Sequence, residues 1–163
     1  MSSGKITLEQ RKASLHYHVQ EYRKRRVIID TDAACEADDP FAIAQALMSK
    51  MLEVKGICAE HFVAEGSMEQ SYEMICRVTE AMGADVPVLR GQTGKMSEHQ
   101  GEPMTEAAQF IIEETMKEDD KPLFVLCIGA VTNVAEAIRA KSEIVDRMTV
   151  AVSYTHLRAH ETG

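Results

Sequence analysis

The stretch Val27–Leu47, VIIDTDAACEADDPFAIAQAL, joins a short apolar run to an apolar helix through a loop crowded with acidic residues. The apolar run 27–29 predicts a buried strand that ends at Asp30. Pro40 occupies a first-turn position that a helix tolerates, so a helix is expected to follow at once. The stretch is therefore typical of a strand–loop–helix unit whose loop supplies polar side chains for binding or catalysis.

Apolar strands and helices alternate along the rest of the chain. Strands are expected at 54–58, 86–89, 123–128 and 148–152, and helices at 40–51, 67–82, 105–117 and 133–140. Continuously apolar strands that alternate with helices are typical of a parallel sheet covered on both faces. The prediction is an α/β fold with a mostly parallel, Rossmann-like sheet that is truncated after about its fifth strand. The carboxyl ends of the strands would share one edge, where such proteins bind ligands.

This predicted domain covers residues 26–152 and has a different kind of segment on each side. Residues 1–25 are expected to form an amphipathic N-terminal helix, which begins with a capping box made by Thr7 and Gln10. The basic run 23–26 is expected to be the solvated end of that helix.

The last segment, residues 153–163, abandons the apolar pattern. We expect it to be a non-native tail and the natural protein to continue beyond this point. His156 and His160 stand four residues apart in the tail, but no third zinc ligand accompanies them, so a zinc site is not expected.

Composition and charge restrict the classes of function. The chain has 163 residues, of which 45% are hydrophobic and 27% charged, a balance typical of globular domains. The net charge of −8 argues against a nucleic-acid partner. No apolar run approaches the roughly 20 residues of a membrane span, and the first residues do not resemble a secretory signal. A cytoplasmic protein with free cysteines is therefore expected.

Five carboxylates stand within ten residues of the central loop: Asp30, Asp32, Glu36, Asp38 and Asp39. Carboxylates at this density repel one another, and a hard divalent cation relieves the repulsion. Calcium suits several carboxylates in a flexible loop, although the spacing is not that of an EF-hand. The alternative is a solvated acidic turn in which Asp39 caps the following helix.

At these residues the sequence resembles the nucleoside hydrolase family of the inosine–uridine type. The signature of that family is a strand followed by DTDPGxDDA and an apolar helix, and this chain has DTDAACEADDPFAIAQAL. Further matches follow in the family's order: LEVKGICA, EGSMEQSYEMICRVTEAMG, PVLRGQ and LFVLCIGAVTNVAEAI. The resemblance covers residues 27–152 and the N-terminal part of the family only. Ala33-Ala34 replace Pro-Gly, and the loop is longer and contains Glu36, similar to a divergent branch with an E-x-D-D sequence.

The resemblance implies a hydrolase that cleaves the N-glycosidic bond of ribonucleosides to ribose and free base, with a water molecule held by calcium. Asp32 would be both a calcium ligand and the general base. Asp39 would be a second calcium ligand, and the backbone carbonyl of Ile128 a third. Asp38 would bind the ribose hydroxyls, and Asp30 would support the site from behind.

Two further residues, Asn133 and His61, stand near the expected ligand edge of the sheet. Asn133 is expected to cap the following helix, and His61 to make a local hydrogen bond rather than to act as the leaving-group acid. A haloacid-dehalogenase-like phosphatase would require Thr or Val where Ala34 stands. The altered loop is compatible with a non-catalytic nucleoside- or sugar-binding relative, or with an inactive fragment of the hydrolase. The expected partner is a small ribonucleoside, and a homo-oligomer is a possible assembly.

Overall fold

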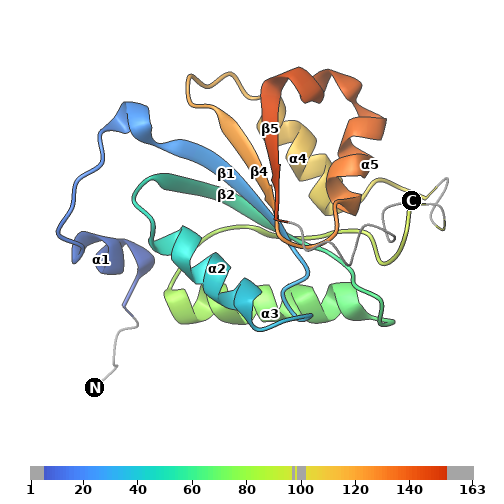
Figure 1. The fold of residues 1–163 in the computed structure, drawn as a ribbon, viewed down its shortest axis with the longest axis horizontal. Helices are drawn as coiled ribbons and strands as arrows, with labels where there is room; N and C mark the ends of the chain where they lie inside the picture. Colours follow the sequence, from blue (N-terminus) through green and yellow to red (C-terminus); the bar gives the residue numbers. More distant parts are fainter. Residues whose placement is uncertain (1–5, 97, 99–101, 154–163) are drawn as a thin grey trace.

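The computed structural model describes residues 6–96, 98 and 102–153, and it confirms the α/β class (Figure 1). The helices, 3-10 turns (η) and strands are α1 (Leu8–Ala13), η1 (Glu21–Arg23), β1 (Arg25–Thr31), α2 (Asp38–Met48), β2 (Leu52–Ala59), α3 (Ser67–Met82), β3 (Val88–Arg90), α4 (Glu106–Met116), β4 (Leu123–Cys127), α5 (Thr132–Ala140), η2 (Ser142–Arg147) and β5 (Met148–Val152). Every strand and helix predicted from residue 27 onward is present. The tail with His156 and His160 lies outside the described residues. No helix in the described part of the chain is long and apolar enough to cross a membrane.

The described strands form one five-stranded sheet in the order β3-β2-β1-β4-β5, and every neighbouring pair is parallel. Along the chain, β2 and β3 follow β1 on one side of it, and β4 and β5 then lie on the other side. In such sheets the crevice for ligands lies at the carboxyl ends of the two strands between which the order reverses. Here those strands are β1 and β4.

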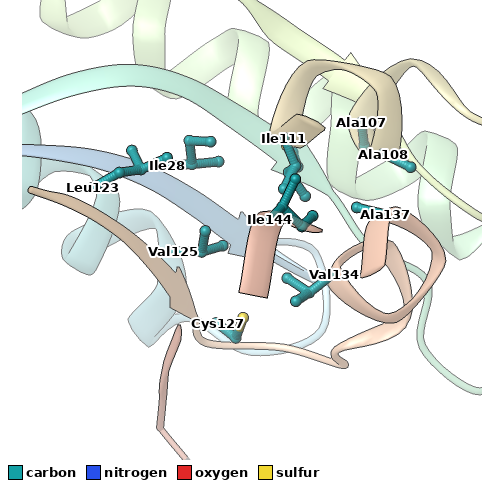
Figure 2. Close-up of a cluster of buried hydrophobic side chains, with 11 residues drawn as sticks. Ile28, Ala107, Ala108, Ile111, Leu123, Val125, Cys127, Val134, Ala137 and Ile144 are labelled. Atoms are coloured by element: carbon teal, nitrogen blue, oxygen red, sulfur yellow. The ribbon is translucent and has the colours of Figure 1, made fainter. Parts of the chain in front are cut away.

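Helices cover both faces of the sheet, with α2 and α3 on one face and α4 and α5 on the other (Figure 1). Side chains alternate along a strand, so the adjacent residues Ile28 and Ile29 of β1 enter different cores. Ile29 packs in the core with α2 and α3. Ile28 belongs to the core shown in Figure 2, together with Cys58, Ala107, Ala108, Ile111, Leu123, Val125, Cys127, Val134, Ala137 and Ile144.

The N-terminal helix is shorter than the prediction for residues 1–25. The predicted capping box is present, since Thr7 and Gln10 exchange backbone-to-side-chain hydrogen bonds of 2.9 and 3.3 Å, but α1 already ends at Ala13. The segment that follows is bound to Lys50, whose Nζ donates to the carbonyl oxygens of Leu15 and Tyr17, each at 2.8 Å. A helical turn would use those carbonyls internally, so these tertiary hydrogen bonds replace the expected helix.

The basic run is only partly the solvated end of a helix, since Arg23 is exposed at the end of η1 but the run continues into β1. Arg26 lies in β1 and is only 4% exposed. Its Nη1 lies 3.4 Å from Oε1 of Glu114 on α4, and its Nε lies 3.5 Å from Oδ2 of Asp119. Its Nε also donates to the carbonyl oxygen of Lys121 at 3.1 Å. Arg26 thus joins the amino end of β1 to α4 and to the segment before β4.

This buried ion pair yields a prediction about stability. Arg26→Met should lower the free energy of unfolding by about 3 kcal/mol. The buried carboxylate of Glu114 keeps its ion pair with Lys117 but loses its buried partner, and the carbonyl oxygens of Glu114 and Lys121 each lose a donor. Urea denaturation measures the change.

The matched control is Arg77→Met on α3, whose ion pair with Glu73 is 72% and 60% exposed, and whose loss should cost less than about 1 kcal/mol. Equal losses in the two variants would contradict the role given to Arg26.

Candidate active site

Asp30 and Asp32 lie at the carboxyl end of β1, in the middle of the sheet. Asp30 is paired in register with Cys58 of β2 and with Cys127 of β4, and its side chain is fully buried. Asp32 follows the end of β1 and is 3% exposed. The acidic loop therefore begins beside β4, at the reversal in strand order where α/β sheets bind ligands.

Asp39 lies in the first turn of α2, and it does not cap that helix. The helix begins at Asp38, and the N-cap residue Ala37 makes no side-chain hydrogen bond, so the capping prediction for Asp39 is wrong. The Asp39 side chain turns inward, is 6% exposed, and accepts a hydrogen bond of 2.8 Å from Oγ1 of Thr31. Burial, and then the charges of Asp32 and Asp38, raise the pKa of Asp39 to about 7.

Asp38 has the opposite environment to its neighbour. It is exposed, as is Glu36 earlier in the loop. Asp39 thus faces the other buried carboxyl groups, whereas Asp38 faces the solvent. The carboxylate of Asp38 is therefore accessible from solvent.

The turn after β4 lies in close contact with Asp32. A Cβ atom on Gly129 would lie only 2.7 Å from both the backbone nitrogen and Oδ1 of Asp32. Ile128 precedes this glycine and donates its backbone N–H to the carbonyl oxygen of Asp30 at 2.9 Å. The structure therefore places the loop after β1 and the turn after β4 in direct contact, which brings Asp32 and the predicted carbonyl ligand Ile128 into one region.

Asn133 connects several strand ends and does not cap α5. The N-cap of that helix is Val131, and Asn133 lies fully buried in the first turn. Its Nδ2 donates to Oδ1 of Asp30 at 2.9 Å and to the carbonyl oxygen of Ala59 at 3.1 Å. Its Oδ1 accepts the backbone N–H of Gln92 at 3.0 Å. The capping prediction fails because this side chain crosses to β1, β2 and the segment after β3.

Glu60 is a buried residue of the site that the sequence reasoning missed. It directly follows β2, is fully buried, and its Oε1 accepts the backbone N–H of Asn133 at 2.8 Å. Burial is the main cause that raises the pKa of Glu60 to about 8. Burial, followed by the charge of Glu60, also raises the pKa of Asp30 well above its usual value. The signal in the sequence was an acidic residue directly after an apolar strand, at the edge where Asp30 stands.

His61 comes next in the chain, at the same edge. Its side chain is 14% exposed, and its Nδ1 lies 3.5 Å from Oε2 of Glu60. This contact is at ion-pair distance and is not a hydrogen bond, so the local hydrogen bond expected of His61 stays a prediction.

The donor chemistry of this edge suits a hard cation. Buried oxygen atoms of Asp30 (Oδ2) and Glu60 (Oε2) have no hydrogen-bond donor among the described residues. An excess of buried carboxylate oxygen is the environment that calcium neutralises, and calcium takes about six to eight oxygen ligands. Within residues 6–96, 98 and 102–153 no three His, Cys, Asp or Glu side chains are arranged to hold a metal ion. The predicted set of Asp32, Asp39 and the Ile128 carbonyl has two such side chains, so other oxygen donors would have to complete it.

Solved structures of nucleoside hydrolases share this fold. An inosine-guanosine nucleoside hydrolase has a TM-score of 0.66 and 23% identity over 86% of this chain and 50% of its own. A purine-preferring ribonucleoside hydrolase from Gardnerella vaginalis has a TM-score of 0.65 and 24% identity over 78% and 48%. A plant nucleoside hydrolase has a TM-score of 0.65 and 19% identity over 78% and 47%. The chain thus spans about half the length of these structures.

A comparison with curated proteins finds no match. The family model described as inosine-uridine preferring nucleoside hydrolase matches residues 27–153, from Val27 within β1 to the end of β5, and this range includes all the residues of the site. The chain therefore belongs to the inosine-uridine preferring nucleoside hydrolase family.

Proposed function

We propose that this chain carries the ribose- and calcium-binding part of an enzyme that hydrolyses the N-glycosidic bond of ribonucleosides to ribose and free base. The observation that carries the proposal is the environment of three aspartates at the carboxyl end of β1. Asp32 and Asp39 are buried, whereas Asp38, next to Asp39 in the chain, is exposed. Two of the solved structures with this fold are described as hydrolases of purine ribonucleosides or of inosine and guanosine, which supports the choice of substrate class.

Asp32, Asp39 and the backbone carbonyl of Ile128 would hold calcium. When bound, the ion would supply a fixed positive charge that orients the reacting water and the ribose hydroxyls. Asp32 is 3% exposed and is held against the Gly129 turn, so its carboxylate has little freedom to move away from the crevice. A fixed carboxylate at this position is suited to accept the proton of water as the water oxygen attacks C1′ of the ribose.

Asp38 would accept hydrogen bonds from the 2′- and 3′-hydroxyls of the ribose. Its place in the first turn of α2 puts it next to Asp39, so the sugar and the cation would be held by neighbouring residues. Asp30 would support the site without contacting the substrate, because it is fully buried and its Oδ1 accepts a hydrogen bond of 2.9 Å from Asn133. The negative charge of the aspartates also favours the positively charged, oxocarbenium-like sugar of the transition state.

Calcium binding tests the metal assignment. Titration calorimetry of the chain with calcium should show binding, and Asp39→Asn should weaken it by about tenfold or more because one charged ligand is lost. Asp120→Asn removes an exposed carboxylate before β4 and should leave the affinity unchanged. Equal affinities of the wild type and Asp39→Asn, or no binding by folded wild-type protein, would contradict this calcium site.

The substrate assignment is tested with two nucleosides that differ in a single hydroxyl. In calcium, the wild type should release ribose from inosine and should cleave 2′-deoxyinosine at least about 100-fold more slowly, since Asp38 then loses a hydroxyl partner. Asp38→Asn should lower the rate with inosine and reduce the difference between the two substrates. Equal rates with both nucleosides would contradict the role of Asp38.

A further inference from the structure

Asp30 holds both ends of the segment that follows β4. At the start of this segment, the backbone N–H of Ile128 donates to the carbonyl oxygen of Asp30 at 2.9 Å. At its other end, in the first turn of α5, Nδ2 of Asn133 donates to Oδ1 of Asp30 at 2.9 Å. Because both ends are bound to one fully buried residue, segment 128–133 has little freedom to move relative to β1.

The backbone carbonyl of Ile128, which is proposed as a calcium ligand, lies between these two anchors. Gly129 follows it and approaches Asp32 so closely that a Cβ atom on the glycine would lie 2.7 Å from Oδ1 of Asp32. The anchors therefore determine where the carbonyl group stands relative to the carboxylate of Asp32. Loss of one anchor would let the two proposed ligands move with respect to each other.

Asn133 is suited to be an anchor because its amide has a donor and an acceptor, and both are used. Besides its bond to Asp30, Nδ2 donates to the carbonyl oxygen of Ala59 at 3.1 Å, and Oδ1 accepts the backbone N–H of Gln92 at 3.0 Å. Aspartate at this position would lack the donor that Asp30 and Ala59 require. An apolar residue would deprive all three of these buried or strand-end partners of a hydrogen bond.

The main chain of Asn133 is fixed as well. Its N–H donates to Oε1 of Glu60 at 2.8 Å, whereas Val131, the N-cap residue of α5, makes no side-chain hydrogen bond. Glu60 thus supplies, from the end of β2, the hydrogen bond that a capping side chain normally makes. Gly91 packs directly on the amide, since a Cβ atom there would lie 2.1 Å from Oδ1 of Asn133. The side chain and the backbone of Asn133 are therefore both held in one position.

We propose that Asn133 is a positioning residue of the cation site, and that its hydrogen bond to Asp30 keeps the Ile128 carbonyl beside Asp32. The inference rests on the proposed function, because the site is that of the proposed calcium ion. Asn133 is fully buried and acts through Asp30 and the turn after β4. Removal of such outer hydrogen-bond partners typically weakens metal binding by about 10- to 100-fold, although every ligand remains.

Hydrogen–deuterium exchange without calcium tests whether Asn133 holds the turn. Asn133→Ala should speed exchange of the amides in segment 128–131 and of Gln92, which loses its acceptor, and should leave α3 unchanged. The control is Val134→Ala, which removes a buried core side chain from the same helix and should leave the exchange of segment 128–131 unchanged. Unchanged exchange of that segment in Asn133→Ala would overturn the proposal. If Asn133→Ala does not fold, as judged by its thermal midpoint, Asn133→Ser replaces it.

Titration calorimetry with calcium then tests the link to the cation site. Asn133→Ala should bind calcium about tenfold or more weakly than the wild type, and Val134→Ala should bind it within about twofold of the wild type. Equal affinities of the wild type and Asn133→Ala would overturn the positioning role while the calcium site stands. Equal weakening in both variants would show a general effect of a damaged core and would also overturn it. If folded wild-type protein binds no calcium, the proposed function fails, and the role of Asn133 with it.

Discussion

The structure depends on the burial of several carboxyl groups side by side at the carboxyl end of β1. Asp30, Asp32, Asp39 and Glu60 are all nearly or fully removed from solvent. Burying charges of the same sign is costly unless hydrogen bonds, proton uptake or a cation compensate for it. Hydrogen bonds from Thr31 and Asn133 stabilise the carboxylates of Asp39 and Asp30. The pKa values of Asp30, Asp39 and Glu60 are nevertheless raised, which shows that these hydrogen bonds do not fully offset the cost of burying the negative charge. A bound cation would complete the compensation, and this links the architecture of the sheet to the proposed chemistry.

Close approach between strand ends is what makes this arrangement rigid. A Cβ atom on Gly91 would lie 2.1 Å from Oδ1 of Asn133 and 2.4 Å from the carbonyl oxygen of Ala59, and one on Gly129 would meet Asp32 at 2.7 Å. Glycine at these two positions lets the segments after β3 and β4 reach the centre of the edge. Asn133, in the first turn of α5, then forms hydrogen bonds with Gln92 after β3 and with Asp30 and Ala59 in β1 and β2. The opposite edge is organised differently, with the buried cation of Arg26 linking β1 to α4.

The fold was predictable from the sequence because each strand from residue 27 onward is an apolar run bounded by a helix pattern, which is a local signal. The acidic loop was found for the same reason, since its carboxylates are adjacent in the chain. The errors concern contacts between distant residues. Asn133 looked like a helix cap but reaches Asp30 and Ala59 across the sheet. Arg26 looked solvated, and its partner Glu114 lies on another element. Glu60 is a single acidic residue after a strand, and only the register of β1 and β2 places it at the site.

The proposed function requires that the loop after β1 and the turn after β4 form one cation site. Hydrogen–deuterium exchange of the chain with and without calcium tests it most directly, because the amides of Cys35 and Ile128 already bond to the backbone of Asp32 and Asp30. Calcium should slow exchange in segments 30–39 and 128–133 together and leave α1 and α4 unchanged. Protection of one segment without the other, or protection elsewhere on the chain, would contradict a shared site.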